Sequence, residues 1–491
     1  MNVVIGLDLG TTTCKALATR PDGRIAANST SAYSTRSHLP GWAEQEPDGV
    51  WQAVIDTLRS VSSHLSAPPA GLSLSGAMHS LLPVTEGGTP LAAAMTWADT
   101  RAKAQARFLR GRTGSHGPYA RTGCPLQPIY TPARLLWFRE NDPEVFGRAA
   151  YFVSLKDWVL FKLTGNWATD IGLASTTGLL DIRSFEWDEE MLAFAGVSAD
   201  RLPALVSPLA IAGAITGEAA EKTGLPAGLP VIAGGSDGGL ANIGAGANTP
   251  GQVVISVGTT GAIRKVVDAP YLDGSIRTWC YVLMEGQWFA GGAINNAGLA
   301  LQWVRDKFYA DIPGDAGYER LLAEATAAHP GAGGVLVLPY FTGERSPYWN
   351  PDASGLIYGL KQDTTRGQIA RAALEGVAFC LADVWEALAE ESQPPEHVSL
   401  TGSVTRMPLW AGIISDVLGL QLHLADAADA SALGAAIIGH MGLGNISRAG
   451  VIPTPDGRGN VVHPDPGRHQ LYRQGHKAFR GLCVDLINSA G

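Results

Sequence analysis

The chain has 491 residues, a formal net charge of −9, and 46% hydrophobic and 16% charged residues. This length exceeds one typical hydrophobic core and predicts two or three domains, and the composition is that of an ordinary globular protein. The negative charge and the lack of a long basic run exclude nucleic acid as a partner, because nucleic-acid binding depends on Lys and Arg contacts to phosphate.

The cysteines and the N-terminus indicate a cytoplasmic protein. The apolar run at the N-terminus has no charged flank and is interrupted at Asp8, so we expect no signal peptide. No apolar stretch reaches the length of a membrane span, and we expect no membrane partner. The five cysteines form no C-x-x-C pair, which is typical of reduced thiols and not of a disulfide framework or a zinc site; they are Cys14, Cys124, Cys280, Cys380 and Cys483.

The first predicted element is a strand, a tight turn and a second strand over residues 3–18. Asp8 precedes the turn and is placed to hold a hydrated Mg²⁺ beside phosphate oxygens, and Lys15 adds a positive charge. No Walker motif occurs in the chain, and an ordinary β-hairpin is the alternative. The residues that offer backbone N–H groups and hydroxyls to a phosphate are Gly10, Thr11, Thr12 and Thr13.

A helix is predicted after residue 46, because Pro47 suits a first helical turn. Trp51 and Leu58 fall on its apolar face, so Trp51 is expected in the core. Trp42 lies before the periodic part and is the better candidate for contact with a ligand.

A predicted strand over residues 72–76 ends at a glycine, and Met78 and His79 follow it. A lone histidine is more often structural than functional. One that lies at a strand end in a Gly-containing turn favours a binding role, and we interpret His79 in this way.

A second candidate pocket follows the next apolar run. Trp97, Asp99 and Arg101 lie at its end and offer an aromatic face and two charges. The alternative is that Asp99 caps a helix over residues 101–110, with Arg101 on the solvated face. Such a helix would not exclude a ligand at its first turn.

A lone carboxylate follows a predicted buried strand near the middle of the chain. The apolar run over residues 231–233 ends in Gly234-Gly235, where the backbone is free to turn or to approach a ligand. Asp237 comes next. We interpret Asp237 as the catalytic base; the alternative is an aspartate in a tight turn, where its side chain bonds local backbone.

The first strand–turn–strand pattern recurs in the second half. Residues 253–257 form a β-rich run that leads into Gly258, Thr259 and Thr260, an echo of the turn after Asp8. Two such loops, one opening each half, indicate a duplicated unit. Facing each other across a cleft, they would hold the phosphates of one nucleotide from two sides. This arrangement resembles the actin/hexokinase/sugar-kinase superfamily.

A strand over residues 398–401 ends in Gly402 and Ser403, and a helix follows that starts near Pro408 and stops at Gly419. A strand–glycine–helix junction lets a flat ring lie against bare backbone, so we assign this junction to adenine. A plain α/β turn is the alternative.

Two further helices are predicted in the second half. One covers residues 365–388, where small residues share a face and indicate close packing. The chain from residue 448 is predicted to be loop-rich, with a last helix over residues 472–486.

Together these motifs resemble the FGGY family of carbohydrate kinases over nearly the whole chain. The resemblance implies an α/β fold of two ribonuclease-H-like domains that face each other across an ATP-binding cleft. It implies an N-terminal domain over residues 1–243 and a C-terminal domain over residues 244–491. The segments that carry it are Asp8-Leu-Gly-Thr-Thr, Gly235-Ser-Asp-Gly, Val257-Gly-Thr-Thr-Gly and Gly402-Ser-Val-Thr-Arg-Met-Pro-Leu-Trp.

The resemblance implies transfer of the γ-phosphoryl group of ATP, with Mg²⁺, to a hydroxyl of a small sugar or sugar acid. Asp237 would be the base and Asp8 the metal ligand. The adenosine motif would place Arg406 with Gly402 and Ser403 at the nucleotide. The residues implied at the sugar are Met78, His79, Trp97, Asp99, Arg101 and Asp237.

Within the family the chain is most similar to the gluconate kinases, so D-gluconate and 6-phosphogluconate are the expected acceptor and product. The similar segments are Ala77-Met-His-Ser, Thr96-Trp-Ala-Asp-Thr-Arg and Phe341-Thr-Gly-Glu-Arg-Ser-Pro-Tyr-Trp-Asn-Pro. Arg101 is then the expected cation for the gluconate carboxylate.

Other features leave D-xylulose open as the acceptor. Xylulose kinases share the Met-His pair, and this chain departs from gluconate kinases at Gln127-Pro128-Ile129 and at Arg134, where those enzymes carry His-Pro-Met and Lys. Gly238 stands where xylulose kinases often carry Asn. Ser403 replaces a family glycine, and its Cβ would narrow the nucleotide site.

Two other classes of function remain as alternatives. An actin- or chaperone-like ATPase would use the same two-loop clamp without a sugar, but it would not need the Trp- and His-rich segments. A weak sugar sensor would not need Asp237. The expected partner is a small sugar or sugar acid, and a homodimer is left open.

Overall fold

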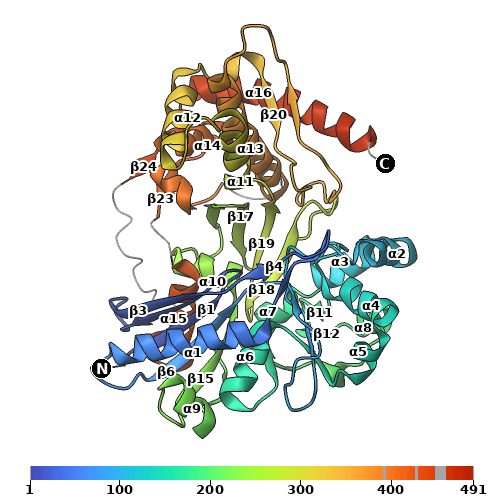
Figure 1. The fold of residues 1–491 in the computed structure, drawn as a ribbon, viewed down its shortest axis with the longest axis vertical. Coiled ribbons are helices and arrows are strands. Elements are labelled where there is room, and N and C mark those ends of the chain that lie inside the picture. The colour runs from blue at the N-terminus through green and yellow to red at the C-terminus, as the bar shows by residue number, and fades with distance from the viewer. Residues whose placement is uncertain (1, 391–393, 426–428, 448–459, 490–491) are drawn as a thin grey trace.

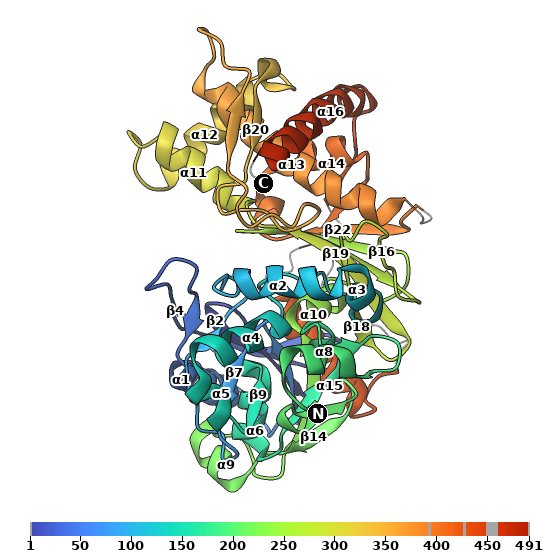
Figure 2. The ribbon, with the colours of Figure 1, turned by 90° about the vertical axis from the view of Figure 1, so that its right-hand side faces the viewer.

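The computed structural model describes residues 2–390, 394–425, 429–447 and 460–489. Two bodies are stacked along the long axis of the molecule, each with a β-sheet at its centre (Figures 1 and 2). The predicted loop-rich stretch after residue 448 lies outside the described residues as far as residue 459.

The lower body in Figure 1 is built on a six-stranded sheet. β1 is antiparallel to β2, β2 is antiparallel to β3, and β1, β6 and β15 are parallel. The strand order is β14 (Ile211–Ala214), β15 (Pro230–Ser236), β6 (Gly71–Gly76), β1 (Val4–Leu9), β2 (Thr13–Thr19) and β3 (Ile25–Ala32).

The upper body repeats this arrangement. The order of its seven-stranded sheet is β18 (Trp279–Met284), β19 (Gln287–Ile294), β17 (Gly261–Val267), β16 (Gln252–Val257), β22 (His397–Thr401), β23 (Leu422–Leu424) and β24 (Val461–Val462). β16 is antiparallel to β17 and parallel to β22, as β1 is to β2 and β6. The duplicated unit and the predicted fold class are confirmed.

Helices cover the sheets. Those of the first half are α1 (Pro47–Ser63), α2 (Lys103–Thr113), α3 (His116–Thr122), α4 (Thr131–Asn141), α5 (Pro143–Arg148), α6 (Leu155–Thr164), α7 (Ile171–Ser175), α8 (Glu189–Ala195), α9 (Gly217–Thr223) and α10 (Asp237–Gly244). Those of the second half are α11 (Gly298–Phe308), α12 (Asp315–Ala327), α13 (Arg366–Ala389), α14 (Pro408–Leu418), α15 (Ala430–Gly442) and α16 (Pro466–Ser489). None of the helices in the described ranges is long and apolar enough to cross a bilayer.

Short elements complete the fold. The small sheets consist of β4 (Thr35–Arg36), β5 (Glu44–Gln45) and β8 (Ala94–Met95); β7 (Leu82–Val84) and β9 (Tyr151–Val153); β10 (Ala168–Asp170) and β13 (Ala204–Val206); β11 (Leu180–Asp181) and β12 (Glu186–Trp187); and β20 (Leu336–Leu338) and β21 (Leu356–Tyr358). The 3₁₀ turns are η1 (Ala199–Arg201), η2 (Ala332–Gly334) and η3 (Ser403–Arg406).

The helix predictions hold, with differences at two helices. The helix predicted over residues 101–110 is α2, which begins at Lys103 and has Ala102, not Asp99, at its N-cap. Trp51 is buried on α1, and α14 ends at Gly419 in the left-handed conformation. α13 begins one residue after Thr365, whose side chain caps its first turn. The last helix begins at Pro466, six residues before the predicted start, because Asp465 accepts a hydrogen bond from the Arg468 N–H and starts the helix there.

One helix of the second half lies on the first sheet. α15 packs against β1 and α10 in the lower body, where its red ribbon stands among blue and green elements (Figure 1). Glycines make the contact close: a Cβ on Gly6 would lie 2.0 Å from the Ala432 carbonyl oxygen, and one on Gly434 would lie 2.0 Å from that of Leu240. The domain boundary at residue 243 stays a prediction. α15 lies beyond that boundary in sequence but packs on the first body.

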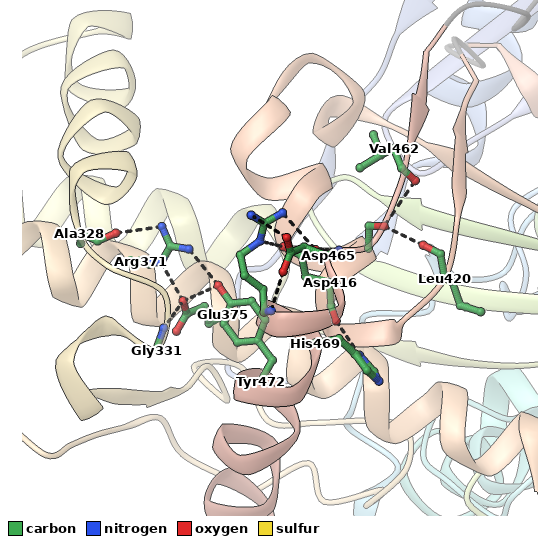
Figure 3. A network of polar contacts seen from close by, with 12 residues as sticks. Ala328, Gly331, Arg371, Glu375, Asp416, Leu420, Val462, Asp465, His469 and Tyr472 are labelled. Carbon is green, nitrogen blue, oxygen red and sulfur yellow. Dashed lines mark hydrogen bonds and ion pairs between the residues drawn. The ribbon is translucent and has the colours of Figure 1, made fainter.

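Buried and half-buried polar contacts join the C-terminal helix to α13 and α14 (Figure 3). Arg371 and Glu375 of α13 form an ion pair with Nε and Oε1 2.8 Å apart, and the hydroxyl of Tyr472 on α16 lies 2.9 Å from each side chain. Arg468 of α16 donates from Nε to Asp416 of α14 at 2.5 Å. Because buried charges are costly without partners, these contacts tie α16 to the upper body.

Gly434→Ala should destabilise the protein. The new Cβ would collide with the Leu240 carbonyl oxygen and force α15 away from α10. Overpacking of this kind costs about 1–3 kcal/mol or more, so we expect a lower midpoint of thermal unfolding in circular dichroism.

Gly111→Ala is the matched control. This exposed glycine lies in α2, and a Cβ added to it would meet no atom within 4 Å, so alanine should stabilise the helix by about 0.5–1 kcal/mol. Equal midpoints for the two variants would contradict the close packing of α15.

Candidate active site

The candidate base follows a bulge in β15. β15 pairs in parallel with β6, and the register shifts at residues 232–235. Gly234 lies at this shift with a φ of +77°, and a Cβ there would lie 1.7 Å from the Leu74 carbonyl oxygen. Only glycine fits this backbone. The strand then ends so that Ser236 caps α10 and Asp237 is the first residue of the helix.

The Asp237 carboxylate is half-buried and has hydrogen-bond partners. Its Oδ1 accepts hydrogen bonds from the backbone N–H of Gly238 at 2.7 Å and of Met78 at 3.3 Å. Burial raises the pKa of Asp237, and the charge of Arg264 opposes this rise. The positive end of α10 also favours the ionised form. The carboxylate is therefore held as a stronger base than an exposed aspartate.

A buried lysine supports the bulge. Nζ of Lys156 donates to the Ala233 carbonyl oxygen at 2.8 Å and forms an ion pair with Asp170 at 2.6 Å. Its methylenes fill the space beside Gly76, where a Cβ would lie 2.5 Å from the Lys156 Cβ. Lys156 thus contacts both strands that place Asp237. It contacts the backbone that leads to the candidate base and does not line the cavity in front of it.

A cavity of about 600 Å³ opens in front of Asp237 and is lined by both bodies. The two predicted phosphate turns meet there although they come from different sheets. Gly10 and Thr13 do not line it; the Gly10 N–H donates to the Thr13 carbonyl oxygen at 3.0 Å and closes the first turn. The phosphate-site residues in the wall are Asp8, Thr11, Thr12, Lys15, Gly258, Thr259 and Thr260.

Asp8 fits the predicted metal site. Its Oδ1 accepts a hydrogen bond from the Ser75 hydroxyl at 2.6 Å. Burial, and then the nearby charge of Asp237, raise the pKa of Asp8 to about 7. A divalent cation between phosphate and these carboxylates would relieve that repulsion. The described residues offer no cluster of three or more His, Cys, Asp or Glu side chains, so phosphate oxygens and water would supply the other ligands.

His79 and two tyrosines form an aromatic wall. His79 has a φ of +64°, and its Nδ1 lies 2.9 Å from the Thr176 carbonyl oxygen. Burial and two nearby arginines lower the pKa of His79 to about 3, so the ring is neutral. Because Nδ1 donates to the carbonyl, Nε2 is left as an acceptor for a sugar hydroxyl. Tyr130 and Tyr281 lie against this ring.

Arg134 orders the backbone behind this wall. It is buried and donates to the carbonyl oxygens of His79, Thr96, Asp99 and Pro128. One guanidinium therefore joins three loops of the candidate sugar site. The same four acceptors would not fit a lysine, which has three donors on one atom.

Asp99 and Arg101 do not line the cavity, which corrects the sequence-based prediction. Nη2 of Arg101 pairs with Asp99 at 2.5 Å and with Glu44 at 2.6 Å, and its guanidinium lies 3.4 Å from the centre of the Trp42 ring. Only 4% of the Arg101 side chain is exposed. Its charge is neutralised by two carboxylates, so it offers none to a ligand. Trp97 does line the wall and donates from Nε1 to the Thr11 hydroxyl at 3.1 Å.

Two other arginines line the cavity and were missed as site residues. Arg264 lies on β17 and Arg345 in the loop after β20. The signal for Arg264 was the pair of charges Arg264 and Lys265 inside a strand whose other residues are apolar or glycine. Arg264 lies on the same face as Ala262, two residues before. Arg345 was noted only within a family segment. Its position depends on a hydrogen bond from Nε to Asn295 at 2.7 Å.

The junction predicted to bind adenosine has one of its three predicted residues, Gly402, in the cavity wall. Gly402 lines the cavity with a φ of +96°, and a Cβ there would lie 2.4 Å from the Val257 carbonyl oxygen. Ser403 and Arg406 begin and end η3 between β22 and α14 and do not line the cavity. A glycine is required at residue 402, whereas the Ser403 Cβ does not narrow the cavity.

Comparison with known proteins identifies the family. Models of the N-terminal and C-terminal domains of the FGGY family of carbohydrate kinases match residues 3–244 and 253–443. The chain belongs to the FGGY family of carbohydrate kinases. It is a sugar kinase, a phosphotransferase that acts on an alcohol group, and kinases of this family use ATP as the phosphate donor.

Gluconate kinases and xylulose kinases are among the proteins to which this kinase is similar. It is 34% identical over 493 residues to the gluconokinase of Bacillus licheniformis, an alignment that covers 99% of this chain and 95% of that protein. It is 30% identical over 491 residues to the xylulose kinase of Escherichia coli (strain K12), with 98% and 99% covered. The structure of gluconate kinase from Lactobacillus acidophilus matches with a TM-score of 0.94 at 27% identity, covering 99% of this chain and 98% of that one.

Asp237→Asn should abolish phosphoryl transfer while ATP binding is retained. Asparagine keeps the size and the backbone hydrogen bonds of the side chain but cannot accept the proton, and a general base contributes about 10²–10⁴-fold. ADP release with acceptor and equilibrium ATP binding measure the two effects separately. A variant that keeps more than about a tenth of the rate would show that Asp237 is not the base.

The rate should also fall in mild acid. Asp237 must be ionised to accept a proton. An ordinary aspartate has a pKa of about 3.9. The pKa of Asp237 is raised, so this carboxylate becomes protonated at a higher pH. The acid limb of the kcat/KM profile should therefore lie above that value. A profile that stays flat down to about pH 4.5 would contradict this environment for the base.

Proposed function

We propose that this kinase phosphorylates D-gluconate at its primary hydroxyl and forms 6-phosphogluconate, with ATP as donor. The observation that carries the proposal is the charge of the cavity wall. Two arginines, Arg264 and Arg345, line it together with aromatic side chains and Asp237. A neutral polyol needs no such charge, whereas a monoanionic acceptor requires a local cation in a protein of net charge −9.

The chemistry follows from the positions of the cavity residues. Asp237 accepts the proton of the primary hydroxyl while that oxygen bonds to the γ-phosphorus, and the bond from the γ-phosphorus to the bridging oxygen breaks to release ADP. The turns at Thr11–Thr12 and Gly258–Thr260 offer donors to the phosphates. Asp8 would hold Mg²⁺, which neutralises phosphate charge when it is bound.

The acceptor is oriented by the aromatic wall. His79 offers Nε2 as a hydrogen-bond acceptor, and the rings of Tyr130, Tyr281 and Trp97 limit the width of the cavity. Because the wall comes from both bodies, their closure would exclude water and protect ATP from hydrolysis. An ATPase without a sugar would gain nothing from this wall.

D-Xylulose is the second candidate acceptor. The full-length similarity to xylulose kinases favours it. So does the Met78-His79 pair in the cavity wall, because the resemblance gives this pair to gluconate kinases and to xylulose kinases alike. Xylulose carries no charge, so it leaves the two arginines without a role in acceptor binding.

The first experiment is ADP release by the purified protein with Mg-ATP against D-gluconate, D-xylulose, L-ribulose, glycerol and no acceptor. We expect the highest kcat/KM with D-gluconate, because only this acceptor presents a carboxylate to the arginines. Preference for D-xylulose would replace the proposed acceptor and keep Asp237 and the phosphate turns. Turnover that does not depend on a sugar would favour the ATPase alternative.

A further inference from the structure

We propose that Arg264 binds the carboxylate of the acceptor and makes the kinase specific for sugar acids. This inference rests on the proposed function and assigns its specificity to one side chain. Arg264 lies in the middle of β17, opposite Val254 of β16 and Gly291 of β19, and its side chain lines the cavity. Sheet pairing on both sides fixes its backbone and therefore the direction of its side chain.

The guanidinium of Arg264 has a free donor. Its Nη1 donates to the Ser256 hydroxyl at 3.1 Å, which anchors one end of the fork. Its Nε is buried and has no hydrogen-bond partner in the part of the chain that the structure describes. A buried donor without a partner costs free energy, and a bound acceptor oxygen would remove that cost.

The other arginines of the region are already engaged. Arg345 donates from Nε to Asn295 at 2.7 Å and from Nη2 to the Ile294 carbonyl oxygen at 3.4 Å. Arg101 pairs with two carboxylates, and Arg134 donates to four backbone carbonyls. Among these four arginines, Arg264 has a buried donor, Nε, that has no partner in the described residues and could bind a ligand.

Space and charge beside the base agree with this role. A Cβ on Gly238 would lie 3.2 Å from the Arg264 Nε and 2.9 Å from the Met78 Cε, so the glycine after the base leaves room for the guanidinium. Arg264 attracts Asp237, yet no ion pair within 4.0 Å joins these two described residues. The carboxylate of an acceptor would supply the direct ion pair that Asp237 does not form with Arg264, although the two charges attract each other.

A second anionic group enters the same cavity, the transferred phosphoryl group of ATP. A guanidinium fork matches carboxylate and phosphate equally well. The two sources differ in what a substitution does: loss of a carboxylate contact affects only acidic acceptors, whereas loss of a phosphoryl contact affects every acceptor and the KM for ATP.

The test compares wild type with Arg264→Gln on D-gluconate and on D-glucitol, which carries a hydroxymethyl group in place of the carboxylate. Arg264→Lys keeps the charge without the fork, and Arg24→Gln removes a charge from a side chain that is 76% exposed. The measurements are kcat/KM for each acceptor, KM for ATP, and the rise in unfolding midpoint that each acceptor produces without ATP.

We expect Arg264→Gln to lose about 10- to 100-fold in kcat/KM for D-gluconate, the range for a charged hydrogen bond. Its KM for ATP should be unchanged, and its unfolding midpoint should rise equally with D-gluconate and D-glucitol. Arg264→Lys should lose less, and Arg24→Gln should behave as wild type. The thermal measurement also establishes whether each variant folds. If Arg264→Gln does not fold, Arg264→Lys tests the role of the side chain.

Two results would overturn the inference and leave the proposed function in place. One is an equal loss for both acceptors with a raised KM for ATP, which would place Arg264 at the phosphoryl group. The other is undiminished use of D-gluconate by both Arg264 variants. A wild type that does not phosphorylate D-gluconate, but does phosphorylate a neutral sugar, would refute the proposed function itself and the inference with it.

Discussion

The geometry of the site depends on the bulge that ends β15. A regular strand would continue in register with β6, and residue 237 would lie in the sheet. The shift at residues 232–235 instead turns the chain into α10, so that Asp237 lies at the positive end of a helix with its carboxylate toward the cavity. Gly234 makes this backbone accessible, and Lys156 bonds the carbonyl oxygen that the bulge releases. The backbone that carries the candidate base is thus positioned by contacts of Gly234 and Lys156, which do not line the cavity.

The pKa shifts of the cavity residues arise because several ionisable groups lie close together with little access to water. Burial raises the pKa of both Asp8 and Asp237, and the charge of Asp237 adds to the rise at Asp8. Burial and the nearby arginines keep His79 neutral. A site with these properties favours a cation beside its carboxylates and an anion beside its guanidinium groups. A magnesium–nucleotide complex together with an acidic acceptor has this distribution of charge.

The two bodies are joined by more than the chain that connects them. α15 comes after the second sheet in sequence but packs on β1 and α10 of the first, through glycines that bring backbone against backbone. Asp429, at its start, lies 3.1 Å from Lys15 of the first hairpin. A segment from the second half of the chain therefore packs on the elements that hold Asp8 and Asp237.

The sequence by itself determined the elements whose signals are local. Strand periodicity and glycine turns located β1–β2 and β16–β17, their repetition indicated the duplicated fold, and a lone carboxylate after Gly234-Gly235 located Asp237 at a strand end. Only the tertiary structure decided which charges face the cavity. Arg101 has one partner, Asp99, two positions before it, but its second partner, Glu44, lies 57 positions away, and Arg264 looked like part of a strand. Contacts between segments distant in sequence complete the neutralisation of Arg101, while they leave the buried Nε of Arg264 without a partner among the described residues.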